Sequence, residues 1–225
     1  MKNMKSKGEI MKSIFVKLKG NGFFTSVMKV GSGNLIGQLL SLISTPILSR
    51  IYSTTAYGDQ AIITSTATII VNLSILGLSS AIMEPRDDIE AKKIFTTGFW
   101  CNLIIGTALI SICLIGSNCF KLFNISQGYF LGLFLTWLYI IIVNTQLMSI
   151  VYTNRKGHYN KLFLNPIIGA ICNILIAIPL GLLGVGFSGF LLTTIISNLI
   201  MLIHMSSGEN PFYKGFRLQD AFYVI

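Results

Sequence analysis

The amino-acid sequence predicts an all-α membrane protein, built as a bundle of six transmembrane helices. Of the 225 residues, 52% are hydrophobic and only 11% are charged, which is too apolar for a surface that faces water. The mean hydropathy of +0.71 agrees with this interpretation. The apolar residues form continuous runs that are long enough to cross a bilayer, which takes roughly 20 residues for a hydrocarbon core of about 30 Å. Because the runs do not alternate with period two, they indicate helices and not the strands of a membrane barrel.

Six runs meet the length requirement for a transmembrane helix. They are Val30–Ile51, Gln60–Met83, Ile94–Ser117, Gly128–Val151, Leu162–Leu182 and Leu183–Met205. The last two runs adjoin within the glycine-rich stretch Gly181–Gly186. We therefore expect a very short turn between the fifth and sixth spans.

The positions of lysine and arginine predict the orientation of the chain. All of them except Arg50 and Lys121 lie ahead of or at the start of the first span, in the second-to-third or fourth-to-fifth connection, or after the last span. Positive charge in short loops is retained on the cytoplasmic side, so both termini are predicted to be cytoplasmic. The chain then divides into a basic amino-terminal segment (1–26), a six-helix transmembrane lobe (27–205) and a cytoplasmic linker (206–225).

The basic amino-terminal segment has too long a charged region for a cleavable signal peptide. Within it, Ile10, Met11, Ile14, Phe15 and Leu18 share one helical face, and lysines lie elsewhere. This pattern is typical of a helix that lies on an anionic leaflet. A solvated basic tail that only enforces topology is an equal alternative.

The charged and reactive residues exclude several classes of function. Every aspartate and glutamate falls in a tail or a connection, so no carboxylate-based coupling site is expected at mid-membrane. The four cysteines form no CxxC pair and have no cluster of histidine or acidic residues near them, so neither a metal nor another cofactor is expected. No catalytic motif is present, which argues against an enzyme. The basic residues are dispersed between apolar runs, which argues against nucleic-acid binding.

A stripe of uncharged polar residues marks the first span. Asn34, Gln38, Ser41 and Thr45 recur at positions i, i+4, i+7 and i+11, which places them on one helix face. In lipid, such a face must meet either a neighbouring helix or a water-filled cavity, and both alternatives stay open. We expect the face to line a vestibule shared with the second span, to which Asn72 would contribute.

Two prolines bear on the helices. Pro46 lies inside the first span, where it removes one backbone hydrogen bond, so we expect a bend there and help from the hydroxyls of Ser44 and Thr45 in satisfying the freed carbonyls. Pro166 follows Asn165 at the start of the fifth span and is expected to begin that helix.

Several segments resemble bacterial oligosaccharide flippases, which carry O-antigen and other polysaccharide repeat units and belong to the multidrug/oligosaccharidyl-lipid/polysaccharide transporter superfamily. The segments are Gly33–Gln38 (GNLIGQ), Thr45–Ser53 (TPILSRIYS), Tyr57–Gly58, Ala81–Phe95 (AIMEPRDDIEAKKIF) and the group Asn154, Arg155, Gly157 and Tyr159. The likeness covers nearly the whole chain. Its motifs identify a family better than a substrate.

The resemblance implies a transporter of two six-helix lobes, twelve or more helices in all, around a central polar cavity in the bacterial inner membrane. This chain would supply the amino-terminal lobe. Such proteins flip undecaprenyl-diphosphate-linked oligosaccharides by alternating access, so the implied partners are that lipid-linked oligosaccharide, membrane lipids, a second lobe and polysaccharide-assembly proteins. Arg50 is the candidate contact for the diphosphate, and an interfacial anchor is its alternative role.

Two rival functions remain. A multidrug/toxin-extrusion-like antiporter would share the architecture but usually carries an acidic ion-coupling residue in its amino-terminal lobe, and its absence from these spans favours the flippase. An inactive gene remnant or a non-transporting membrane subunit is the rival from another class.

Overall fold

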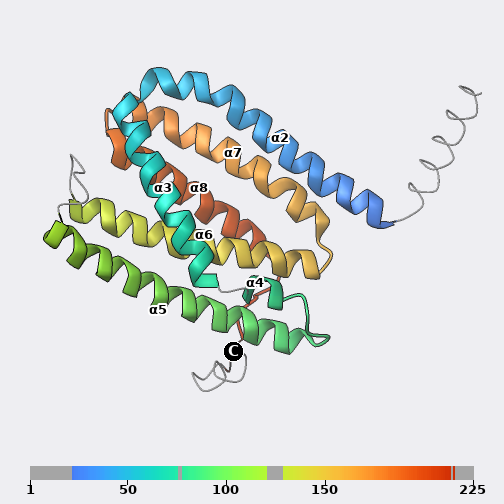
Figure 1. Ribbon diagram of the computed structural model, residues 1–225. Coiled ribbons are helices and arrows are strands. Elements are labelled where there is room, and N and C mark those ends of the chain that lie inside the picture. The colour runs from blue at the N-terminus through green and yellow to red at the C-terminus, as the bar shows by residue number, and fades with distance from the viewer. Residues whose placement is uncertain (1–21, 76–77, 121–128, 214, 216–225) are drawn as a thin grey trace, which may run out of the picture.

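The computed structural model describes residues 22–75, 78–120, 129–213 and 215, and this part of the chain is helical with no strands (Figure 1). The long helices are α2 (Gly22–Ile51), α3 (Thr54–Ile75), α5 (Asp88–Phe120), α6 (Tyr129–Arg155), α7 (Tyr159–Leu182) and α8 (Gly186–Ser206), and the short helix α4 (Leu78–Ala81) follows α3. The predicted all-α class is confirmed for these residues. The apolar face predicted near the amino terminus and most of the predicted linker lie outside the described residues.

Among the described residues, four helices are long and apolar enough to cross a membrane. They are α5, α6, α7 and α8, and the chain is therefore a multi-pass membrane protein. Helices α2 and α3 are also long, with 30 and 22 residues, but they do not reach the same apolarity. The polar residues that the sequence places in these two helices account for the difference.

Four helices, α2, α3, α5 and α7, begin ahead of their predicted spans, and in α3 and α5 a polar residue caps the earlier start. The hydroxyl of Ser53 accepts a hydrogen bond from the backbone N–H of Ala56 at 3.2 Å, at the start of α3. The carboxylate of Asp87 accepts one from the N–H of Ile89 at 3.2 Å, at the start of α5. Such caps satisfy the free N–H groups of a first helical turn, so each of these two helices starts in its polar connection and not at its first apolar residue.

The structure contradicts two expectations about the prolines, while the bend at Pro46 stays a prediction. Helix α2 continues through Pro46, and the hydroxyls of Ser44 and Thr45 both donate to the carbonyl of Ser41, each at 2.8 Å. That carbonyl is not the one that Pro46 leaves free, which lies four residues before the proline, so the predicted help from these hydroxyls is wrong. Pro166 lies inside α7. The expectation that it begins the helix is also wrong, because α7 starts in the polar connection ahead of the apolar run.

The helices form a row of neighbours, with α3 crossing it. Helix α2 lies beside α7, α7 packs on α8, α8 on α6 and α6 on α5, while α3 contacts α5, α6 and α8 (Figure 1). Helix α2 is thus at the edge of the bundle, and α7 is its principal partner. The predicted short turn between the last two long helices is confirmed, with positive φ angles of +69° at Gly184 and +65° at Gly186, a conformation that glycine adopts without strain.

Helices α2 and α7 run parallel in close backbone contact. A Cβ atom added at Gly33 would lie 2.3 Å from the carbonyl oxygen of Phe163, and one added at Gly37 would lie 2.9 Å from that of Pro166. Further along, Gly181 of α7 lies against the end of α2. Small residues of this kind let helices approach within a membrane, and no larger side chain fits at Gly33 without moving backbone.

The far end of the α2–α7 contact is held by Tyr52. Its hydroxyl donates to the carbonyl of Ala177 at 2.8 Å, and its ring stacks on Phe190 of α8 with centroids 4.6 Å apart. The rings of Tyr57 and the same phenylalanine form a T-shaped pair with centroids 4.8 Å apart. These contacts fix the α2–α3 connection against α7 and α8.

One end of the bundle, which we name the basic end, carries all the described lysines and arginines except Arg50. They are Lys29, Arg86, Lys92, Lys93, Arg155, Lys156 and Lys161. Arg50 lies in the last turn of α2, at the opposite end.

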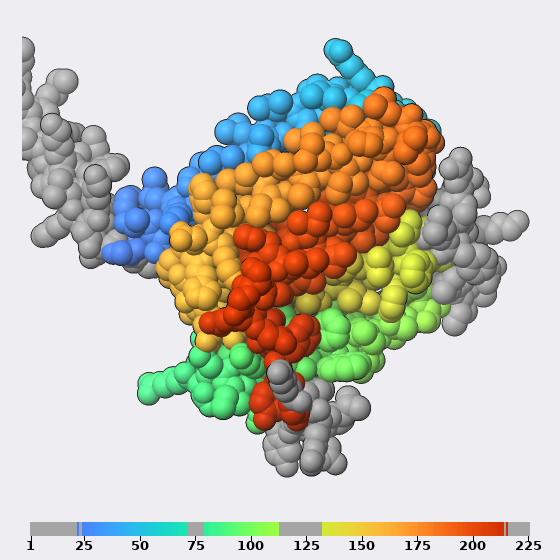
Figure 2. Space-filling model, turned by 180° about the vertical axis from the view of Figure 1, so that it is seen from behind, coloured from blue at the N-terminus to red at the C-terminus, as the bar shows by residue number. Residues whose placement is uncertain are grey.

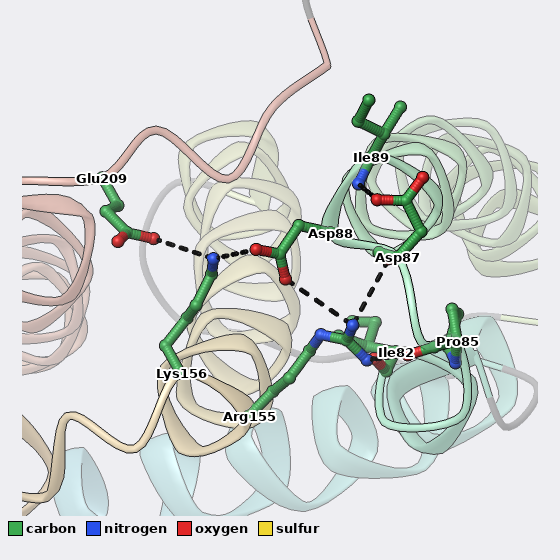
Figure 3. Close-up of polar contacts among 8 residues, drawn as sticks. All are labelled: Ile82, Pro85, Asp87, Asp88, Ile89, Arg155, Lys156 and Glu209. Carbon is green, nitrogen blue, oxygen red and sulfur yellow. Dashed lines mark hydrogen bonds and ion pairs between the residues drawn. The ribbon is translucent and has the colours of Figure 1, made fainter.

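Arg155 ties the connection between α4 and α5 to the end of α6 (Figure 3). Its guanidinium donates to the carbonyls of Ile82 at 3.2 Å and Asp87 at 3.3 Å, and also to that of Pro85. An arginine can do this because its planar fork presents several donors at once.

Lys156 joins three segments at the same end. Its ammonium lies 2.5 Å from the carboxylate of Asp88 and 3.6 Å from that of Glu209 (Figure 3). The hydrogen bond from Lys156 to Asp88 raises the pKa of the lysine. Both charges of this pair are therefore offset within the protein.

We predict that Gly33→Ala lowers the thermal stability of the detergent-solubilised protein. The added methyl group would push backbone atoms of α2 and α7 apart, and overpacking of this kind costs about 1–3 kcal/mol. Gly31→Ala is the matched control, because a Cβ at Gly31 meets nothing within 4 Å. Equal melting temperatures for the two variants would contradict the close contact.

Candidate functional site

An open groove of about 730 Å³ lies between α2, α7, α8 and the start of α3. The α2 wall contains Asn34, Gln38, Ser41 and Thr45, and all four side chains are exposed. The structure thus brings together the whole polar stripe that the sequence predicts for the first span.

The facing walls come mostly from helices far away in the sequence. Their polar and aromatic members are Tyr57 and Gln60 of α3, Asn173 of α7, and Phe190, Thr194, Ser197 and Asn198 of α8. The sequence predicts a vestibule shared with the second span. In the structure α3 contributes only residues of its first turns to the groove. The reason is the parallel contact of α2 with α7, which turns the adjacent polar face of α2 toward α8.

Two hydrogen bonds order the walls of the groove, one between two helices and one within α8. The Gln60 side-chain amide donates to the hydroxyl of Thr194 at 3.0 Å, which joins α3 to α8. The amide of Asn198 donates to the backbone carbonyl of Thr194 at 2.7 Å. These bonds orient two amides along the wall that faces α2.

Other polar groups of the groove are free to meet a ligand. The side-chain amides of Asn34, Gln38 and Asn173 make no hydrogen bond within the part of the chain that the structure describes. The hydroxyl of Ser197 also lacks a partner there, although its residue is only 3% exposed. Buried polar groups are normally satisfied, so the Ser197 hydroxyl is a position where water or a ligand is expected.

The hydroxyls of the α2 wall present acceptors to the groove. Ser41 donates to the carbonyl of Gly37 at 3.1 Å, and Thr45 donates to that of Ser41 at 2.8 Å. Each hydroxyl has therefore used its one proton within the helix and keeps a lone pair for a donor in the groove.

The groove is uncharged, and its lining combines polar side chains with apolar ones such as Leu42, Leu48 and Met201. None of the residues that line it is Asp, Glu, Lys, Arg or His. Its recognition chemistry consists of amides, hydroxyls and the aromatic residues Tyr57 and Phe190. Among the described residues no group of three or more His, Cys, Asp or Glu is placed to hold a metal ion.

The two other predicted site residues are Arg50 and Asn72, and a further polar residue of α7 is Asn165. Arg50 is exposed at the end of α2 and does not line the groove. Asn72 belongs to α3, but its side chain lies outside the described residues. Asn165 is buried, with a side-chain oxygen that has no partner among the described residues, and it does not line the groove.

Sequence reasoning missed the polar residues of α8. Thr194, Ser197 and Asn198 follow one another at i, i+3 and i+4, the same periodicity that identified the stripe of α2. They could have been found by the same criterion, but Ile195 and Ile196 lie between them and dominate the hydropathy of this segment.

The family model of polysaccharide biosynthesis proteins matches residues 47–210. This range begins near the end of α2 and extends past α8, so it covers most of the chain, and the polar stripe of α2 precedes it. Searches of curated proteins and of solved structures gave no match. The chain belongs to the family of polysaccharide biosynthesis proteins.

Proposed function

We propose that this chain is one lobe of a flippase that carries lipid-linked oligosaccharides across the bacterial inner membrane, with the groove receiving the glycan. The observation that carries the proposal is the chemistry of the groove, in which the amides of Asn34, Gln38 and Asn173 are free and no charged side chain is present. The family of polysaccharide biosynthesis proteins supports it.

The groove matches the hydrogen-bonding character of a sugar. Each sugar hydroxyl donates one hydrogen bond and accepts others, and a side-chain amide such as that of Asn34, Gln38 or Asn173 offers both donors and an acceptor. The aromatic residue Tyr57, which is only partly buried, offers apolar surface for the C–H face of a sugar ring. The volume of about 730 Å³ falls within the roughly 300–1,000 Å³ of small-molecule sites.

The proposal assigns α2 and α3 to the membrane together with the four apolar helices, which gives six crossings. The polar residues of α2 then face the groove, while its exposed apolar residues, such as Leu39 and Ile43, face lipid. The basic end is cytoplasmic in this arrangement, because positive charge is retained on that side. Both ends of the six-helix lobe are then cytoplasmic as well.

Alternating access requires a second body against which the lobe can move. Helix α2 lies at the edge of the described bundle and packs mainly on α7, so the groove beside it is open. A second six-helix lobe, as the resemblance to oligosaccharide flippases implies, would close it from the other side and rock against it.

The chemistry of the lining also separates the proposal from a drug antiporter. Exchange of a cationic drug for protons needs a titratable group at the binding site. Among the residues that line the groove none is acidic or basic, which favours a neutral glycan. A non-transporting membrane subunit would leave the variants below without effect.

We predict that Gln38→Leu and Asn173→Leu impair transport in a flippase-deficient strain that makes a matching glycan, when they are introduced into the complete gene. Each removes a free amide from the groove, at a cost of about 1 kcal/mol per lost hydrogen bond, so the double variant should restore much less surface polysaccharide than either single variant. Immunodetection of surface polysaccharide, normalised to the amount of protein in the membrane, measures this. The 225 residues alone should not restore transport.

The matched control compares two threonines that each donate to a carbonyl four residues earlier. Thr45, in the groove, does so at 2.8 Å, and Thr68, outside it, does so at 2.7 Å. Thr45→Val should reduce transport and Thr68→Val should not. Equal activity of all groove variants and the wild type would overturn the assignment of the glycan to the groove.

Arg50 provides a separate prediction about the diphosphate. If Arg50 contacts the phosphate on the outer side, the Arg50→Gln variant should lose transport activity. Arg50→Lys should keep part of it, because a single ammonium cannot reproduce the bidentate fork of the guanidinium. As an interfacial anchor it would tolerate both changes. We predict the first pattern in the same complementation assay, and full activity of Arg50→Gln would reject it.

A further inference from the structure

We propose that a second cavity, at the basic end, binds the phosphate group of a membrane lipid. It has a volume of about 580 Å³ and lies between the start of α2 and the connection from α6 to α7. Its lining includes Lys29 of α2 together with His158 and Lys161 of the α6–α7 segment. No acidic residue lines it.

The basic residues at this end fall into two groups, one paired with acidic residues and one lining the cavity. Arg155 and Lys156 lie beside the carboxylate of Asp88, and Lys156 also lies near Glu209. Their charges are offset by acids, so these two residues stabilise the fold.

The positive charges of the two lysines that line the cavity are not paired with acidic residues in this way. Lys161 donates to the backbone carbonyl of Ser207, which is neutral and leaves its positive charge in place. Lys29 is exposed and forms no ion pair with any described residue. The cavity therefore has a net positive lining, which attracts an anion.

The uncharged groups of the cavity fit a phosphate. The lining contains the hydroxyl of Thr25 and the side-chain amide of Asn160, and neither makes a hydrogen bond within the described part of the chain. Both can donate to phosphate oxygens. With Lys29 and Lys161 they supply charged and neutral donors from two helices.

The position of the cavity indicates that the phosphate arrives on a lipid. Figure 2 shows the first residues of α2 beside the segment that leads into α7, at the surface of the bundle. Basic pockets between membrane helices on the cytoplasmic side are typical binding sites of anionic headgroups. Two lipids carry this chemistry, an anionic phospholipid and the polyprenyl diphosphate carrier. The inference depends on membrane placement and not on glycan binding in the groove.

The test uses the full chain in nanodiscs of phosphatidylcholine with or without phosphatidylglycerol. Native mass spectrometry counts the lipids that remain bound after transfer to detergent. The wild type should retain phosphatidylglycerol in preference to phosphatidylcholine. Lys29→Gln combined with Lys161→Gln should weaken this binding by about tenfold or more, because hydrogen bonds to charged groups are the strong ones.

Arg86→Gln is the matched control, since Arg86 is an exposed cation at the same end and does not line the cavity. It should leave binding unchanged, and Lys29→Gln alone should weaken it without disturbing the contact of Lys161 with Ser207. Equal retention of the two lipids, or an equal loss in Arg86→Gln, would overturn the proposal. Competition with undecaprenyl diphosphate then identifies which lipid supplies the phosphate. If it displaces phosphatidylglycerol at an equimolar ratio, the site belongs to the carrier. If it does not, the site belongs to the phospholipid.

Discussion

The backbone contact between α2 and α7 decides what the rest of the molecule can do. Gly33 and Gly37 bring the two helices so close that a methyl group at Gly33 would meet the Phe163 carbonyl. This contact uses one face of α2, and the neighbouring face, with its polar stripe, is then directed along the groove toward α8. The groove of neutral amides and hydroxyls that we propose for the glycan is therefore a consequence of the close contact that these two glycines allow.

The two cavities differ in the charge of the residues that line them. The groove between α2, α7 and α8 contains no charged side chain, as expected where an unpaired charge would be costly to bury in a membrane. The cavity at the basic end contains Lys29 and Lys161, whose charges water and lipid headgroups would solvate in the proposed membrane placement. A lipid-linked sugar has the same division between a neutral glycan and an anionic phosphate, which is consistent with the two proposed roles.

The sequence was sufficient for features that depend on local geometry. The helical class, the stripe of α2 and the glycine turn before α8 all follow from periodicity and backbone preference. The starts of α3 and α5 were missed because the capping residues Ser53 and Asp87 lie outside the apolar runs. The walls opposite α2 were missed because they depend on a contact between glycines of α2 and the backbone of α7, residues that are far apart in the sequence and carry no hydropathy signal.

Accessibility of α2 to water tests the central claim most directly. In a chain whose native cysteines are replaced, single cysteines at Gln38 and Thr45 should react with a membrane-impermeant maleimide applied to proteoliposomes of mixed orientation. Cysteines at Leu39 and Ile43, which are 58% and 64% exposed on the face turned away from the groove, should be protected by lipid. Protection of the first pair, or equal labelling of both pairs, would contradict a hydrated groove along the polar face of α2.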